Sequence, residues 1–442
     1  MKKIFLLIAA SLISVAPMMA QTKVNVNKDA ILGKIAKSDA DIANPKKAAK
    51  STTWINRGKA LMDAETAISG NLFENMDMMT LNLLFGKAPQ EAQVEKGGTA
   101  FTQLVYPDFV AYTDGATVQG WEITNVIYEG ALDKAIEAYK KAYELSSSSA
   151  AKVQEALKEV WNAVLKEASN AYNLGEFKRA GDYFAKAYEL SVLPYSGMEA
   201  DFASAYSAGL SYIYCNEFQP SYDNLVIARD GGVEQDGDVY YIMYHAYKGI
   251  CNGDKAKLAE AEANLTAGLE KYPNNSKIIE CMTDLYVELE RDPSQIVTIV
   301  KAAIDKDPNN ASLWNGLGRV YDQLGDTDSA INAFHKVAEL QPTDYVGFWS
   351  LGILYIRKGD AAIDALNKKT FTGQAEYDAD LNAANEIYYN ALAPLEKAHE
   401  LNPSELPILE YLKNLCFRLR DYKPEIMDKY NKYNEEFKAA KQ

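Results

Sequence analysis

The chain has 442 residues, of which 48% are hydrophobic, and its 46 basic and 61 acidic side chains give a formal net charge of −15. This hydrophobic content is enough for a continuous core, so the composition excludes a chain that is disordered as a whole. Nucleic-acid recognition needs clustered lysine and arginine, so the acidic balance predicts that the chain has no nucleic-acid partner. The length suits two or three ordinary domains or one long repeat array.

The N-terminus has the pattern of a secretory signal peptide. A basic start with two lysines is followed by the mainly apolar run 4–16, and then by Ala20 and the polar Gln21. An apolar run of this length is too short to span a bilayer, so a membrane anchor is the weaker interpretation. We predict a signal peptide over residues 1–20 that is cleaved near Ala20. We also predict an exported, periplasmic protein without a transmembrane segment.

Residues 21–146 contain a helical start that is interrupted by a long insertion. Residues 21–50 are polar and read as a lead-in segment. A helix is expected from residue 51, where Trp54 and Gly58 stand four apart, but its partner helix arrives only at residue 131. The insertion between them, 70–130, is too rich in aromatic residues for disorder, and long segments of this kind are usually functional.

Residues 147–344 carry a repeated helix-turn-helix pattern, which is clearest over 311–344. Its recurring residues are Trp314, Leu317, Gly318, Tyr321, Gly325, Ala330, Phe334 and Pro342. Pro308 precedes Pro342 by 34 residues, and a proline ends a helix because its ring removes a donor and clashes with the preceding turn. The helical segment before Pro308 departs most from the pattern, because Asp284 stands where glycine or alanine is usual.

Two further segments complete the chain. Residues 345–403 repeat the first half of the pattern, with Gly359 in the place of Gly325, but the matching second helix comes late. We therefore predict a second insertion over 360–385. Residues 404–442 form a degenerate helical pair with a polar end, as a capping repeat requires.

The spacing of these residues resembles the tetratricopeptide repeat (TPR) family, in which helix pairs stack into a superhelix. The resemblance covers about residues 51–440. It implies an all-α, right-handed solenoid of about eight helix pairs with two insertions. The chain is similar in this respect to the exported TPR proteins of Gram-negative cell envelopes.

The family resemblance also implies where a partner would bind. In TPR proteins, fixed positions of each first helix face a concave groove. In this chain that rule selects Tyr206, Leu210, Tyr214, Tyr241, His245, Asn315, Arg319, Asp322, Trp349, Ile353 and Arg357. Such a groove suits an extended peptide or an amphipathic helix. The alternative is that the array closes on itself or on its insertions and buries some of these side chains.

The sequence contains no catalytic constellation. The histidines lie on different repeats and in no metal-ligand spacing, and no nucleophile elbow, phosphate loop or dinucleotide fingerprint is present. We therefore predict no enzyme activity, no cofactor and no metal. Cys215, Cys251, Cys281 and Cys416 are interpreted as small buried residues, with a disulfide between Cys215 and Cys251 as the alternative.

Two functions of different classes follow. The leading hypothesis is a non-enzymatic periplasmic scaffold or adaptor that binds a peptide or helical segment in the groove. Such a protein can also associate with complexes of the cell envelope. The alternative is a glycan- or nutrient-binding envelope protein, in which Tyr106, Tyr112 and Trp121 of the insertion stack against sugar rings. An enzyme with its site in the first insertion is a third and weaker hypothesis.

Overall fold

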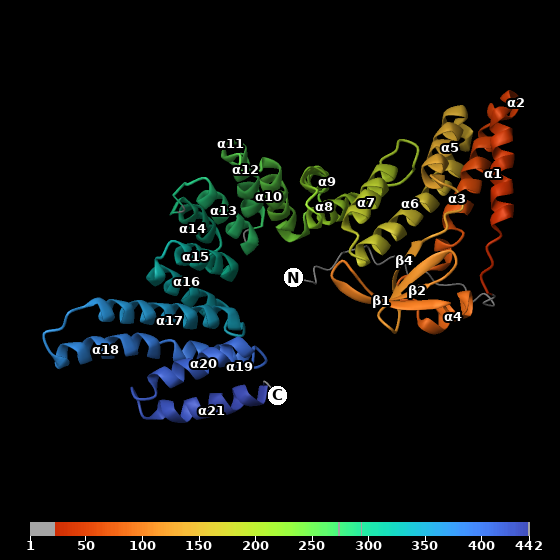
Figure 1. Ribbon diagram of the computed structural model, residues 1–442. Helices are drawn as coiled ribbons and strands as arrows, with labels where there is room; N and C mark the ends of the chain where they lie inside the picture. Colours follow the sequence, from red (N-terminus) through yellow and green to blue (C-terminus); the bar gives the residue numbers. More distant parts are fainter. Residues whose placement is uncertain (1–22, 273–274, 293, 441–442) are drawn as a thin grey trace. The chain divides into compact units, whose positions relative to one another are not determined.

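The computed structural model describes residues 23–272, 275–292 and 294–440 (Figure 1). The predicted signal peptide, 1–20, lies outside these residues. The chain divides into two compact units. The first unit holds the residues up to Gln235 together with His245–Asn252, and the second holds Asp236–Tyr244 and Gly253–Gln442. Within the described ranges, every helix is too short or too polar to cross a bilayer.

The first unit is built from antiparallel helix pairs: α3 packs on α5, α6 on α7, and α8 on α9. Gly58 of α3 lies so close to the ring of Tyr139 on α5 that any side chain at this position would collide. The two helices that the sequence pairs across the insertion are therefore in contact. The helices of this unit are α1 (Lys28–Ala43), α2 (Pro45–Ala48), α3 (Ser51–Thr66), α4 (Met78–Phe85), α5 (Ala131–Leu145), α6 (Ala150–Asn173), α7 (Phe177–Ser191), α8 (Phe202–Tyr214) and α9 (Phe218–Asp230).

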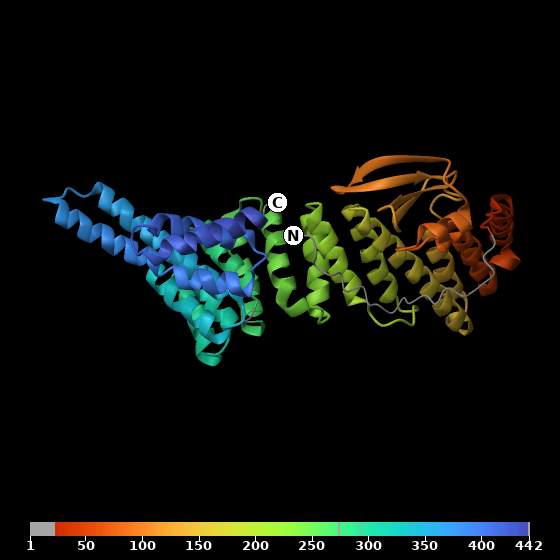
Figure 2. The same cartoon turned by 90° about the horizontal axis from the view of Figure 1, so that it is seen from below.

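The first insertion contains an antiparallel sheet, which the sequence analysis did not predict. Its strands are β1 (Gln90–Lys96), β2 (Thr99–Val105), β3 (Phe109–Thr113) and β4 (Val118–Ile123), in the order β1-β2-β3-β4. Gly97 and Gly98 both have positive φ and make the two-residue turn between β1 and β2. Figure 2 shows the strands as one layer along the helices of the first unit. The all-α prediction is right for the repeats but misses this sheet.

The second unit continues the helix pairs. Its helices are α11 (Lys255–Leu258), α12 (Ala261–Lys271), α13 (Ser276–Glu288), α14 (Ser294–Lys306), α15 (Ala311–Gln323), α16 (Thr327–Leu340), α17 (Tyr345–Lys368), α18 (Gln374–Tyr389), α19 (Leu392–Leu401), α20 (Leu406–Leu419) and α21 (Glu425–Ala440), and α10 (Asp238–Cys251) is shared between the units. In the pair α15–α16, Gly318 lies against the ring of Phe334, and Gly325 has a φ of 76° at the turn. These residues have the packing and turn roles that their spacing predicts.

The structure corrects the frame of the pair α13–α14. Ser276 begins α13 and Ala311 begins α15, 35 positions later, so residues of α13 match residues of α15 at that offset. Buried Thr283 therefore matches Gly318, and Asp284 is exposed. The frame set by Pro308 is thus wrong by one residue for α13, because Pro308 follows the start of α13 by 32 positions whereas Pro342 follows the start of α15 by 31.

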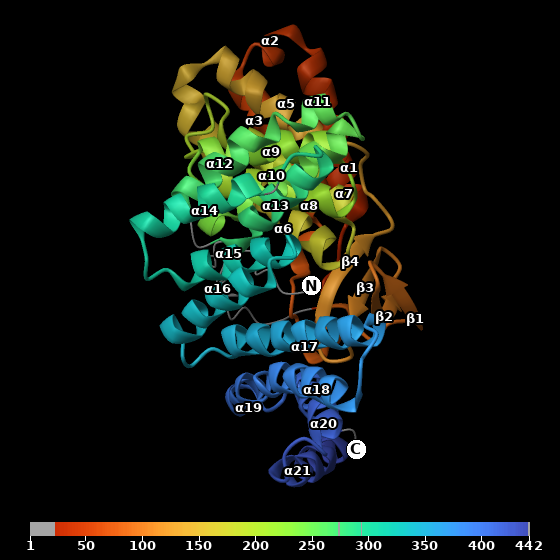
Figure 3. The same ribbon diagram turned by 90° about the vertical axis from the view of Figure 1, so that its left-hand side faces the viewer.

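The second insertion is a helical extension. The spacing predicts a turn at Gly359, but α17 continues through this residue to Lys368, and α18 returns alongside it (Figures 1 and 3). The residues after Gly359 are helix formers such as alanine and leucine, so nothing ends the helix there. Gly359 instead makes room for the ring of Tyr388, which lies 2.8 Å from where a Cβ would stand.

Candidate functional site

Ion pairs join successive first helices of the second unit on one face. Arg319 of α15 donates to Glu280 of α13 at 2.6 Å, and Arg357 of α17 donates to Asp322 of α15 at 2.7 Å. All four side chains remain at least 30% exposed. The predicted groove residues Arg319, Asp322 and Arg357 are therefore together on an accessible face, and the corrected frame adds Glu280 to them.

The same face continues onto α10. Lys277 of α13 donates to the hydroxyl of Tyr241 at 2.9 Å, and its ammonium lies 4.4 Å from the centre of that ring. The neighbouring Tyr244 donates to Asp284 at 2.5 Å. Tyr241 and Tyr244 are buried, so these rings anchor α13 on α10, and their hydroxyl groups meet charged residues at the edge of the core. His245, the other predicted residue on α10, is exposed.

An apolar patch lies at the other end of this face. Trp349 and Ile353 of α17 are half-buried, and the ring of Trp349 packs edge-on against Tyr411 of α20, with ring centres 5.3 Å apart. Tyr411 itself is 41% exposed. Asn315, on α15, is half-buried, and its Oδ1 is one of three buried side-chain atoms in the described residues that lack a hydrogen-bond partner. A buried acceptor of this kind is uncommon in a native fold.

The family match agrees with this arrangement of helices. Residues 300–332, from within α14 to the first turns of α16, match the sequence model of the tetratricopeptide repeat. This stretch of the chain is a tetratricopeptide repeat. No curated protein sequence matches it.

Several solved structures are similar to this chain, although all have low identity and low TM-scores. A TPR repeats protein from Bacteroides fragilis is 17% identical, with 58% of this chain and 97% of that chain covered and a TM-score of 0.28. YrrB, described as a TPR protein with an unusual peptide-binding site, is 18% identical, with 62% and 97% covered and a TM-score of 0.27. IFIT1 is 11% identical, with 69% and 68% covered and a TM-score of 0.34.

Two of the three predicted groove residues on α8 are core residues. Tyr206 and Leu210 on α8 are buried, because α8 is packed between α7 and α9 and nearly all of its faces are covered. Their assignment to an open TPR groove is therefore corrected. Tyr214, at the end of the same helix, is 44% exposed and packs against Tyr172 and Phe177.

The aromatic residues of the first insertion do not form a sugar platform. Tyr106, Tyr112 and Trp121 are only 5%, 2% and 0% exposed. Tyr106 stacks on Phe109 with ring centres 4.5 Å apart, and the Tyr112 hydroxyl donates to Glu122 at 2.8 Å. This prediction is corrected because these rings are the insertion's own core, and no ring face is left for a ligand.

Asn170 of α6 fastens the sheet to the repeats, and the sequence analysis missed it. Its Oδ1 accepts the backbone N–H of Trp121 at 2.7 Å, and its Nδ2 donates to the carbonyl of the same residue at 2.8 Å. Asn170 is completely buried. The side chain therefore pairs with β4 as a neighbouring strand would. No motif marks such an asparagine, since only its place opposite the strand gives it this role.

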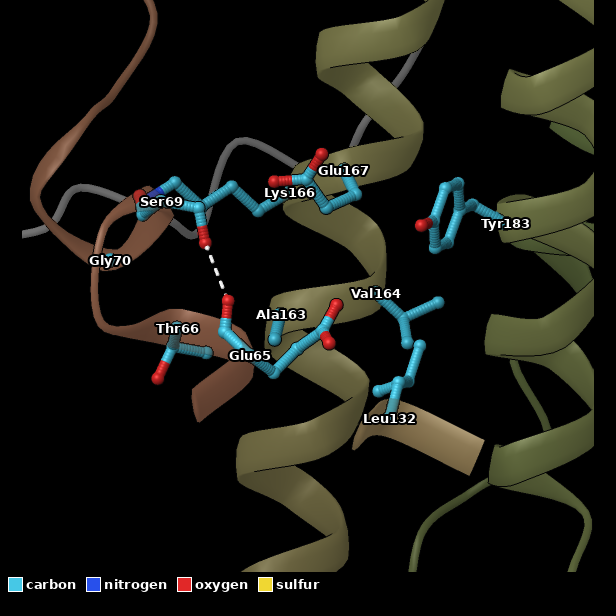
Figure 4. A pocket seen from close by; sticks show the side chains of 10 residues that line it. All are labelled: Glu65, Thr66, Ser69, Gly70, Leu132, Ala163, Val164, Lys166, Glu167 and Tyr183. Carbon is cyan, nitrogen blue, oxygen red and sulfur yellow. Dashed lines mark hydrogen bonds between the residues drawn. The ribbon is translucent and has the colours of Figure 1, made fainter. Parts of the chain in front are cut away.

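A small cavity with both polar and apolar lining residues lies at the foot of the insertion (Figure 4). It measures about 30 Å³, which is room for about two water molecules. Lys166 donates from the wall of this cavity to the carbonyl of Ser69 at 2.6 Å. The residues that line it are Glu65, Thr66, Ser69, Gly70, Leu132, Ala163, Val164, Lys166, Glu167 and Tyr183.

The titrating groups of the cavity are shifted by burial. Loss of water raises the pKa of Glu65, and the nearby charge of Glu167 raises it further. The same burial lowers the pKa of Lys166 and raises the pKa of Tyr183 to about 12. The cavity is too small for more than water, and the described residues hold no cluster of three or more potential metal ligands. We interpret it as a small water-sized gap between the helices of the first unit and the first insertion.

No disulfide joins the cysteines of the described residues. Cys251, Cys281 and Cys416 are buried, as the sequence analysis predicts. Burial raises the pKa of the Cys416 thiol to about 12, which makes it a poor nucleophile.

Proposed function

We propose that this chain is a non-enzymatic scaffold that binds a peptide or helical segment of a partner protein on the first-helix face of its second unit. The first-helix face is defined as Lys277, Glu280, Asn315, Arg319, Asp322, Trp349, Ile353 and Arg357. The TPR fold itself suggests protein–protein interaction. The proposal adds the place on the molecule and the kind of ligand.

The observation that carries the proposal is the pair of exposed ion pairs beside the aromatic patch. Exposed ion pairs contribute only about 0–1 kcal/mol to stability, so Arg319 and Arg357 can exchange their carboxylate partners for those of a ligand at little cost. Trp349 is an aromatic residue of the type that anchors interfaces. Together they offer a hydrophobic contact and charged rims of both signs, which suits an amphipathic segment.

A pair of photo-crosslinking variants tests this assignment. One carries the crosslinking residue at Arg319 on the first-helix face, and the other carries it at Asn332, which is exposed on α16 in the same repeat. Exposed to an extract of the cell envelope, the first variant should crosslink a protein and the second should not. Equal crosslinking at both positions, or retention of polysaccharide alone, would contradict the proposal.

The proposed place of action is the periplasm. The basic start, the apolar run 4–16 and the small residue Ala20 support export. Fractionation of the source cells with mass measurement tests this: we expect a periplasmic protein that begins near Gln21. A full-length protein in the cytoplasmic fraction would contradict it.

A further inference from the structure

The two edge strands of the insertion's sheet differ in whether other segments bind their outer backbone groups. The edge at β4 is covered, because Asn170 binds both backbone groups of Trp121. Further along, the N–H of Asn75 donates to the carbonyl of Val118 at 2.8 Å, and the N–H of Val118 donates to Met76 at 2.9 Å. At the other edge, β1 pairs with β2 alone, and no other described segment is bonded to its backbone. One edge of the sheet is therefore open.

The hairpin geometry shows which groups point out of this edge. Lys96 and Thr99 pair across the two-residue turn, and in such a hairpin this closing pair exchanges hydrogen bonds. The pattern alternates along an antiparallel ladder, so the backbone groups of Glu95, Gln93 and Glu91 point away from β2. The register runs over all seven residues of β1 without a bulge. These outward groups therefore form a regular row that an added strand can bind.

The open edge carries glutamates but has no bulge, no proline and no free lysine. Natural edge strands are commonly protected by proline, by bulges or by a free lysine. Inside β1 there is no proline, and its single lysine, Lys96, is engaged by Glu122 and Glu176. Gln90 to Gln93 and Glu95 are all exposed. The strand is thus an accessible template for β-augmentation, in which an extended segment joins the sheet through its backbone.

Charge decides what kind of strand fits. Glu91, Gln93 and Glu95 share one face of β1, since side chains alternate along a strand. In a symmetric antiparallel pairing of two full β1 strands, Glu91 of each copy would face Glu95 of the other, and like charges directly opposite are destabilising. The net charge of −15 also disfavours a second copy. A strand with two basic residues four positions apart would instead place one opposite each glutamate.

We propose that the β1 edge is a docking strand for an extended, basic segment of a partner protein. The segment adds to the sheet as a further strand beside β1 and places lysine or arginine opposite Glu91 and Glu95. This surface is separate from the first-helix face, so the two proposals stand or fall independently.

Two labelled peptides and three variants test this site in the full chain. Both peptides have a sequence in which threonine and valine alternate. One peptide carries two lysines four positions apart, and the other carries two glutamates at the same positions. Fluorescence anisotropy should detect binding of the lysine peptide and weaker binding, by about tenfold, of the glutamate peptide. Gln93→Pro removes an outward N–H and should abolish binding, whereas Gln93→Thr keeps that donor and should preserve it. The double variant Glu91→Lys/Glu95→Lys should reverse the preference between the peptides.

The same variants also show whether a loss of binding is caused by a loss of folding. Proline is tolerated on an edge strand where the N–H faces solvent, so Gln93→Pro should retain the wild-type thermal unfolding profile. If it does not, the charge-reversal variant still tests the proposal, because it leaves the backbone unchanged. Equal affinity of both peptides, binding unaffected by Gln93→Pro and by charge reversal, or self-association that Gln93→Pro abolishes would each overturn the assignment.

Discussion

The two insertions of this chain interrupt helix pairs in different ways. The first, 70–130, builds a separate sheet with a core that includes Trp121 and Met76. The second, 360–385, prolongs the repeat's own helices α17 and α18, and Tyr388 in the last turn of α18 belongs to the same core as the C-terminal helices. One insertion is therefore an added layer, and the other is an enlarged repeat.

The difference lies in how each insertion is fastened to its repeat. The sheet is attached to the repeats through the hydrogen bonds of buried Asn170 and through Leu174, which packs among Phe101 and Tyr112 of the sheet. The helical hairpin is held by close packing, since Gly359 allows the ring of Tyr388 against the backbone of α17. An aromatic-rich insertion is thus not by itself evidence for a ligand, because an added layer needs large side chains for its own core.

The largest effect is expected from Asn170→Leu, which removes the polar attachment of the sheet. Both backbone groups of Trp121 lose their partner in a buried place, and each unsatisfied buried group costs about 1–3 kcal/mol. We expect the free energy of unfolding, measured with urea, to fall by about 2–6 kcal/mol. Asn162→Leu on the same helix is the control, since Asn162 is half-buried and makes no such bond. Equal effects of the two substitutions would contradict a special role for Asn170.

Packing of the second insertion is tested by Gly359→Ala. A Cβ at this position would stand 2.8 Å from the Tyr388 ring, so overpacking should cost about 1–3 kcal/mol in spite of the better helix propensity of alanine. Gly33→Ala in α1 is the matched control, because no atom lies within 4 Å of its Cβ position. That variant should gain up to about 1 kcal/mol. Thermal unfolding of both variants measures the contrast, and a stabilising Gly359→Ala would show that the ring does not need the glycine.

The repeats were predictable from sequence because their packing residues recur at fixed local spacing. Trp314, Gly318 and Phe334 have the expected places in one helix pair. Three of the four strands of the sheet were not predictable, because β2, β3 and β4 lack a regular alternation of polar and apolar residues. All five residues of β3 are buried because both of its faces are covered. The exception is β1, where Glu91, Gln93 and Glu95 alternate with Ala92 and Val94, a strand signal that the sequence analysis did not use.

The candidate site was only partly predictable for a similar reason. The family rule finds Arg319 and Arg357 on the exposed face, but it also selects Tyr206 and Leu210, which packing against neighbouring helices buries. Spacing gives the direction of a side chain from its own helix. It does not show what covers that direction.

A smaller effect is expected from Tyr388→Phe, which keeps the ring of the second insertion and removes its hydroxyl. The hydroxyl donates to Asp360 on the prolonged part of α17. A hydrogen bond of this kind contributes about 0.5–1.5 kcal/mol to stability, and somewhat more when the acceptor is charged. The free energy of unfolding, measured with urea, should therefore fall by about 1–2 kcal/mol. Tyr377→Phe in the same hairpin is the control, since its ring contacts Phe371 and its hydroxyl has no hydrogen bond among the described residues. A loss clearly larger than that of Gly359→Ala would mean that the hydroxyl, rather than the close packing, fastens this insertion.

The smallest effect is expected from Glu65→Gln in the cavity at the foot of the first insertion. Burial and the charge of Glu167 raise the pKa of Glu65 in the folded state, so folding favours its protonated form. The stability from this group is fully present below the unfolded pKa and is lost as the pH rises through the folded value. Glutamine cannot ionise, so the variant should unfold at a higher temperature than wild type at pH 8, and the difference should vanish below pH 4. The same substitution at Glu155, which is exposed on α6, should show no such pH-dependent gain. If Glu65→Gln instead destabilises the protein at every pH, the ionised carboxylate stabilises the attachment of the first insertion. The polar attachment of that insertion would then include Glu65 as well as Asn170.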